Sequence, residues 1–309
     1  MKTKNLFRLT FLVVAIIGLS LSGCKKDKNS DNTDATSLQQ LAGDEETMES
    51  AMDESMNDVN NYLSGGNLKS TSMVPCNATV DSTAVVNDTI TIFITYNGVN
   101  CSGTRYRAGR VEIKKQVGTL WFQEGATVSV KHINFLIAKT ANNTKFITLN
   151  GIKIYKNISG GLIWQLGNGI NTIVHRTYGH LNITFNDGTS KTWNIARQKT
   201  YSGVAPYNLT LSSDGFGVAD GYENLVTWGV NRQGENFYTQ ILESVTRNQV
   251  CNWDPSAGIK KHSIPADNKS ATITFGYDEN NQPIGNECPS KYKVDWQKNN
   301  KSGTVYLWL

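Results

Sequence analysis

From about residue 76 onward, apolar and polar residues alternate in short runs, which is the period-2 pattern typical of β-strands. The run at 89–96 is rich in β-branched and aromatic residues, and the run at 128–136 alternates. Similar runs occupy 145–155, 181–185, 192–196, 271–275 and 304–308. Turn-forming residues at 186–190 lie between 181–185 and 191–195, and they predict a hairpin there.

After residue 70 only the stretch 238–245 has a weakly helical pattern. Strands that no helix separates pair mainly in antiparallel fashion. We therefore expect an all-β domain of about twelve to fifteen strands, built as a large antiparallel sandwich or as a curved meander sheet.

Residues 37–63 have a different period. Their apolar residues recur mostly three or four positions apart, which predicts a short amphipathic helix. Ser37 can cap the start of this helix, and Gly65 and Gly66 can stop it. The apolar positions are Leu38, Leu41, Met48, Met52, Met56, Val59, Tyr62 and Leu63.

Charge divides the chain unevenly. Residues 27–63 carry a net charge of −9, whereas residues 64–309 carry +8. The acidic helix either docks on the basic domain or remains a solvated spacer. Exposed ion pairs contribute at most about 1 kcal/mol each, and ordering a residue costs about 1–2 kcal/mol. These values favour the spacer, and they predict that deleting 27–63 leaves the melting temperature nearly unchanged.

The N-terminus has the pattern of a secretion signal. Lys2, Lys4 and Arg8 precede an apolar run at 9–21, which is too short to span a bilayer as a helix. The run ends in Leu-Ser-Gly-Cys at 21–24, which resembles the bacterial lipobox. The resemblance implies cleavage before Cys24 and acylation of its thiol and amine, including a palmitate-type chain.

The resemblance also bears on location. Lys25 follows the acylated cysteine, where an Asp would signal retention in the inner membrane. We therefore expect a protein of the outer membrane, lipid-anchored at its periplasmic face or at the cell surface. The expected organisation is a signal peptide at 1–23, a lipidated flexible tether at 24–36, an acidic helix or spacer at 37–66 and a β domain at 67–309.

Four cysteines remain after Cys24, and an even number in an exported protein predicts two disulfides. Four cysteines allow three connectivities. Cys76 and Cys101 bracket one Thr-Ile-Thr strand, and Cys251 and Cys288 bracket another. We therefore predict the pairs Cys76–Cys101 and Cys251–Cys288. A zinc site is disfavoured because the chain has no Cys-x-x-Cys pair.

The stretch 89–115 combines a Thr-Ile-Thr-Ile strand, a Tyr-Asn-Gly turn, Cys-Ser-Gly at 101–103 and Arg-Ala-Gly-Arg-Val at 107–111. With the lipobox and the acidic segment, it resembles outer-membrane lipoproteins of Bacteroidota with a β-rich body. The resemblance implies location and fold class, and it brings no catalytic residues. The chain departs from that pattern at Thr104, where an acidic residue is expected.

No motif of a known catalytic class occurs, including the nucleophile elbow, the zincin helix and the phosphate-binding loop. We therefore predict no catalytic residue, no metal and no cofactor. His175 and His180 are five residues apart and fall on opposite faces of an extended strand, which disfavours a shared metal. The formal net charge of +4 is too small to suggest nucleic acid as a partner.

Two features suggest ligand contacts. Trp253 stands beside Asp254 and Pro255 in an expected loop, where an indole can stack on a sugar ring. Arg105, Arg107 and Arg110 belong to a basic row that could meet acidic glycans or lipid phosphates. Such a row is more often a solvated edge strand.

These patterns favour a non-enzymatic binding module of the outer membrane, whose partner is a glycan, another envelope component or a protein. The alternatives are a glycan-directed hydrolase and a hydrophobic-ligand carrier on a curved sheet. Two carboxylates ~5–10 Å apart across a cleft would favour the hydrolase, and an apolar concave face would favour the carrier. A filled core between flat sheets would favour the binding module.

Overall fold

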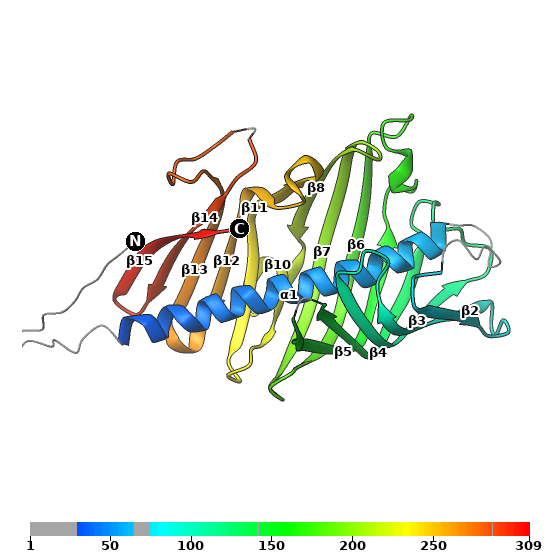
Figure 1. The fold of residues 1–309 in the computed structure, drawn as a ribbon, viewed down its shortest axis with the longest axis horizontal. Coiled ribbons are helices and arrows are strands. Elements are labelled where there is room, and N and C mark those ends of the chain that lie inside the picture. Colours follow the sequence, from blue (N-terminus) through cyan, green and yellow to red (C-terminus); the bar gives the residue numbers. More distant parts are fainter. Residues whose placement is uncertain (1–29, 65–73, 141, 286) are drawn as a thin grey trace, which may run out of the picture.

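The computed structural model describes residues 30–64, 74–140, 142–285 and 287–309. It shows one long helix, α1 (Ser30–Ser64), lying across a single sheet of fifteen strands (Figure 1). The strands are β1 (Ala78–Ser82), β2 (Thr89–Val99), β3 (Arg105–Gln116), β4 (Thr127–Lys139), β5 (Asn142–Asn157), β6 (Thr172–Phe185), β7 (Ser190–Val204), β8 (Asn208–Gly215), β9 (Gly217–Ala219), β10 (Tyr222–Val230), β11 (Asn236–Asn248), β12 (Pro255–Ile264), β13 (Lys269–Tyr277), β14 (Lys291–Lys298) and β15 (Lys301–Trp308).

The sheet is an antiparallel meander in which neighbours in sequence are almost always neighbours in space. Its order is β1 to β7, then β10 to β15, while β8 pairs with β7 and β11 and β9 pairs with β10. The predicted hairpin at 186–190 joins β6 to β7 and is confirmed. The stretch 238–245, whose pattern is weakly helical, belongs to strand β11, which is hydrogen-bonded to β10 and β12.

Glycines allow the sheet to bend around the helix. Gly151 in β5 and Gly179 in β6 have φ angles of 137° and 157°. At either position a Cβ would lie 2.3 Å from a carbonyl oxygen of the neighbouring strand. Only glycine permits this close approach, and glycine kinks of this kind give a sheet its curvature.

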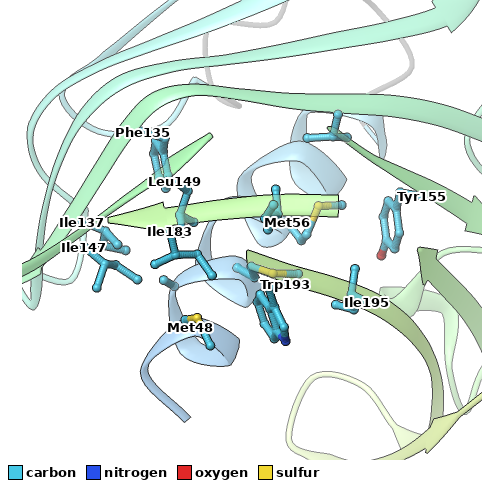
Figure 2. Close-up of a cluster of buried hydrophobic side chains, with 14 of the residues drawn as sticks. Met48, Met56, Phe135, Ile137, Ile147, Leu149, Tyr155, Ile183, Trp193 and Ile195 are labelled. Atoms are coloured by element: carbon cyan, nitrogen blue, oxygen red, sulfur yellow. The ribbon is translucent and has the colours of Figure 1, made fainter. Parts of the chain in front are cut away.

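Helix α1 packs on the inward face of the sheet and belongs to the main hydrophobic core. Figure 2 shows Met48 and Met56 among side chains of β4 to β7, including Leu149, Ile183 and Trp193. Met48 and Trp193 are completely buried. Among the residues of α1 whose exposure is described, Gly43, Thr47, Asn57 and Asn61 face solvent.

The expectation of a solvated spacer is therefore wrong, and so is the boundary that places the helix outside the β domain. The helix also begins at Ser30, seven residues before the expected cap at Ser37. Residues 30–36, expected in the flexible tether, are helical. The signal peptide, Cys24 and the expected stop at Gly65 and Gly66 lie outside the described residues.

Ion pairs with the sheet explain why the acidic helix docks. Glu49 contacts Arg197 at 3.1 Å and Lys260 at 3.9 Å, and Asp53 contacts Lys199 at 2.5 Å. Further pairs along the helix are Asp44 with Arg232, Glu45 with His262, Glu54 with Arg105 and Arg107, and Asp58 with Arg107. The charge asymmetry of the sequence is thus neutralised inside the fold, where pairs are screened far less than at the surface.

Both predicted disulfides are confirmed. Cys76–Cys101 joins the segment before β1 to the turn between β2 and β3. Cys251–Cys288 joins the short helix η3 (Gln249–Cys251) to the loop between β13 and β14. Each bridge connects positions that the meander already brings together.

Candidate functional site

An apolar groove of about 490 Å³ lies between residues 38–43 of α1 and the inward face of β12 to β15. Leu38 and Leu41 of the helix are buried in the core. Among the strand residues that line the groove, Ile273 is buried, whereas Phe275 and Trp296 are only partly buried. The groove is therefore a part of the concave face that remains accessible beside the described side chains of the helix.

Strand alternation supplies the floor of the groove. Every second residue of β13, β14 and β15 faces inward, and these positions are almost all aliphatic or aromatic. They are Ala271, Ile273, Phe275, Tyr292, Val294, Trp296, Val305 and Leu307. Leu38, Ala42 and Gly43 of the helix form the facing wall, and Asp254, Pro255, Trp308 and Leu309 also line the groove.

The position of Trp296 is set by a glycine on the neighbouring strand. Trp296 pairs directly with Gly303. A Cβ on Gly303 would lie 2.8 Å from three atoms of the indole ring. The ring therefore lies flat over the bare backbone of β15, and it contributes its other face to the groove.

The helix contributes Leu38 and Ala42 to the facing wall, and Ala42 is partly buried against the core. Gly43 also borders the groove, but it is exposed and lies roughly 200° around the helix from the buried Leu41. A side chain at Gly43 would therefore point to solvent, where a Cβ would meet no atom within 4 Å. Bulk that is to fill the groove from the helix must come from Ala42.

The inner end of the groove is polar. His262 Nδ1 lies 2.9 Å from Thr239 Oγ1 and 3.4 Å from a carboxylate oxygen of Glu45. Burial lowers the pKa of His262 to about 4, so the imidazole is neutral at pH 7. Its Nε2 atom has no hydrogen-bond partner among the described residues. Lys260 lies beside it, 3.9 Å from Glu49.

These features suit binding better than bond cleavage. Among the described residues that line the groove, Asp254 is the one carboxylate, so the lining does not supply the pair that a glycoside hydrolase needs. In the described part of the chain, no cluster of three or more His, Cys, Asp or Glu side chains is arranged to hold a metal ion. The chemistry offered is an apolar surface with polar groups at one end.

The side chains of the predicted basic row lie on different faces of β3, and one of them is buried. Arg107 is 1% exposed, because it faces the helix and pairs with Asp58 and Glu54. Arg105 lies on the same side, 3.9 Å from Glu54. Arg110 faces the other way and stacks on the ring of Phe93 at 3.7 Å. Strand alternation separates their directions, because Arg105 and Arg107 are two residues apart on β3, whereas Arg110 is three residues beyond Arg107.

Trp253 lies nearer to the groove. It is 36% exposed in the loop before β12, next to the groove-lining Asp254 and Pro255. Its role in ligand binding stays a prediction. His175 and His180 are separated as expected, since His175 is buried against Tyr155 while His180 is exposed and bonds Asn194.

A second depression of about 710 Å³ lies between the ends of β2 to β4. Its lining is mainly polar or small and includes Lys114, Lys115, Gln123 and Glu124. It lacks the convergent aromatic side chains of the groove, so we regard the groove as the better candidate for a ligand site.

No protein-family model matches the chain, and neither the curated proteins nor the solved structures compared with it contain a match. None of the described helices is both long and apolar enough to cross a membrane. The site must therefore be interpreted from its own geometry. Sequence reasoning missed it, although the alternation at 271–275 and 304–308 marks the floor strands.

Proposed function

We propose that this protein is an outer-membrane lipoprotein that binds an apolar ligand, with a linear acyl chain lying in the groove between α1 and β12 to β15. The observation that carries the proposal is the partly open apolar groove on the concave face of a curved sheet. This is the hydrophobic-ligand alternative among the functions considered from the sequence.

The composition of the groove supports an acyl chain rather than a sugar. Its volume lies within the range of about 300–1,000 Å³ that is usual for small-molecule sites. Aliphatic and aromatic side chains line both walls, whereas a sugar would need several polar partners. The unpartnered Nε2 of His262 and the amine of Lys260 suit the single polar end of such a ligand.

Filling the groove from the helix side should block binding. We expect Ala42→Phe to weaken binding of the apolar dye N-phenyl-1-naphthylamine by about tenfold or more, equivalent to about 1.4 kcal/mol. The reason is that Ala42 lines the groove, so the phenyl ring would occupy part of its volume. Dye fluorescence measures the affinity, and competition with palmitic acid tests acyl-chain specificity. The chain 24–309 with Cys24→Ser avoids acylation during purification.

Thr47→Phe is the matched control. It should change the affinity by no more than about threefold, because Thr47 is exposed on the helix and does not line the groove. Equal affinity of Ala42→Phe and the parent chain would contradict the proposed site. Failure of palmitic acid to displace the dye would contradict the ligand class.

The lipid anchor is the second part of the proposal, and the lipobox at 21–24 supports it. Cys24→Ala should abolish acylation and leave the precursor uncut, because the thiol is the proposed site of the first acyl chain. Metabolic labelling with an alkyne-tagged palmitate, followed by immunoblotting for precursor size, measures both effects. Labelling of the variant at the parental level would refute anchoring through Cys24.

A further inference from the structure

The two edges of the sheet where strands connect differ sharply in character. We define the rim as the described residues of the loops 117–126, 158–171, 205–207, 249–254 and 278–290 (without 286), which follow β3, β5, β7, β11 and β13 at one edge. These loops lie along the upper edge of the sheet in Figure 1. The opposite edge consists of short turns at 100–104, 186–189, 231–235, 265–268 and 299–300.

Large apolar side chains are exposed along the rim. Phe122, Trp164, Tyr207 and Val250 are 47%, 64%, 84% and 68% exposed. Val204, at the last residue of β7, is 54% exposed. The turns of the opposite edge contain no large apolar residue at all. Isolated exposed apolar residues are common on proteins, but their concentration at one edge marks an interaction surface.

The rim is one connected structure rather than a set of independent loops. Gly161 donates a backbone hydrogen bond to Phe122, and Ala205 donates one to Leu166. The side chain of Gln249 donates to the carbonyl of Pro206. These bonds hold the exposed residues in place before any partner arrives, which lowers the entropic cost of binding.

The connections continue to the groove. The disulfide Cys251–Cys288 ties the loop after β11 to the loop after β13. Leu309 then donates a backbone hydrogen bond to Ser290, which joins the C-terminus to the same loop. Leu309 and Trp308, which is 62% exposed, line the groove. The exposed apolar rim therefore runs directly into the mouth of the groove.

From this continuity we infer that the rim inserts its side chains into a lipid surface, so that the groove opens toward the lipid from which it takes its acyl chain. Tryptophan and tyrosine are the residues that favour the headgroup region of a bilayer. The inference deepens the proposed function and rests on it for the identity of the ligand. The rim is a separate surface, and binding of an acyl chain in the groove does not itself require it.

The charge of the rim specifies the kind of lipid. Its five loops contain Glu124, Asp254, Asp278, Glu279 and Glu287 and no Lys or Arg. The rim therefore repels anionic headgroups, and apolar contacts must supply the binding. We expect the chain 24–309 with Cys24→Ser to bind phosphatidylcholine vesicles at least as well as vesicles containing phosphatidylglycerol. Binding should not weaken when salt is raised, because no electrostatic attraction supports it.

Two matched variants test the inference. The rim variant carries Phe122→Ala, Trp164→Ala and Tyr207→Ala, and the control carries Ile152→Ala, Tyr178→Ala and Leu242→Ala. The control residues are 48%, 43% and 49% exposed but lie within strands β5, β6 and β11. In vesicle co-sedimentation we expect the rim variant to lose about tenfold or more in partitioning and the control to stay within about twofold.

Absence of vesicle binding by the parent chain, or equal losses in the two variants, would overturn the inference. So would concentration-dependent self-association of the parent chain that the rim variant abolishes, because the rim would then bind a second copy. Circular dichroism melts of both variants establish that they fold. Binding of N-phenyl-1-naphthylamine separates the two proposals. A parent chain that binds the dye but not vesicles rejects the lipid-facing rim and leaves the groove. The rim variant should keep its dye binding while it loses vesicle binding.

Discussion

Glu49→Gln should destabilise the protein by about 3 kcal/mol or more, because it leaves two buried cations without their carboxylate. Glu49 is 7% exposed and lies between Arg197 and Lys260, which are 5% and 8% exposed. Burial alone would raise the pKa of Glu49, but the charges of Arg197 and Lys260 outweigh it and hold the pKa below its ordinary value. The carboxylate is therefore charged at neutral pH and compensates both cations.

Thermal unfolding measures this effect. A loss of 3 kcal/mol corresponds to a fall in melting temperature of about 6–12 °C for a domain of this size. Glu243→Gln is the matched control, because it removes the same charge from an exposed position in β11. We expect the control to shift stability by less than about 0.5 kcal/mol. If the two variants melt together, the ion pairs under the helix do not hold it on the sheet.

Mild acid should weaken the fold by about 4 kcal/mol between pH 7.5 and pH 5. Burial lowers the pKa of His262 to about 4 and that of His175 to about 3, and it also lowers the pKa of His132. A histidine whose folded pKa is depressed stabilises the fold fully above its unfolded pKa of about 6.5. This stabilisation is lost as the pH falls from the unfolded pKa toward the folded pKa. By pH 5 the loss is about 2 kcal/mol for His262 and about 2 kcal/mol for His175.

The surroundings of each histidine support this direction. Lys260 and Lys191 lower the pKa of His262 further, while Glu45 partly restores it, and Lys199 lowers the pKa of His175. Asp44 and Asp58 have the opposite effect on the pH dependence of stability. Burial raises their pKa values, so their protonation at low pH removes the cost of keeping a charged carboxylate buried. The buried histidines should dominate above pH 5, since ordinary aspartates titrate near 4.

Urea unfolding at pH 7.5 and at pH 5.0 measures the change. His262→Asn should reduce the acid-induced loss by about 2 kcal/mol, because asparagine does not titrate. His180→Asn should leave the loss unchanged, because that side chain is exposed. A parent chain that is equally stable at both pH values would mean that the buried histidines keep their ordinary pKa values.

Local features of the fold can be predicted from the sequence. The runs of alternating residues predict seven of the fifteen strands, the turn residues at 186–190 predict the hairpin between β6 and β7, and the cysteine brackets predict both disulfides. All of these signals operate over short stretches of chain. In a meander, neighbours in sequence are also neighbours in space, so local signals determine nearly all of the sheet.

The packing of α1 could not be predicted in the same way. Thr227 and Thr239, which both donate to Glu45, lie more than 180 residues from it along the chain. Nothing in the local pattern shows that such side chains meet. The sequence suggests exposed ion pairs of small value, whereas the curved sheet surrounds the helix and buries them. The acidic residues beside the apolar stripe of α1 are therefore part of the interface between the helix and the sheet.

The groove depends on the same long-range geometry. Trp296 and Leu307 read as ordinary inward residues of a sheet, and Ala42 reads as an ordinary helical alanine. They form a site only because the fold brings the helix and the last strands, far apart in sequence, to opposite sides of one groove. Arg107 fails as a predicted ligand contact for the same reason, since the helix that covers it lies about fifty residues away in sequence.

The most direct test of the central claim is to map where an acyl chain binds. A palmitic acid analogue with an alkyl diazirine can be crosslinked to the chain 24–309 carrying Cys24→Ser, and the adducts can be located by peptide mass spectrometry. We predict adducts within 38–43 and on β13 to β15, which unlabelled palmitic acid suppresses and Ala42→Phe removes. Adducts confined to other strands, or adducts that palmitic acid does not suppress, would contradict the assignment of the groove as the ligand site.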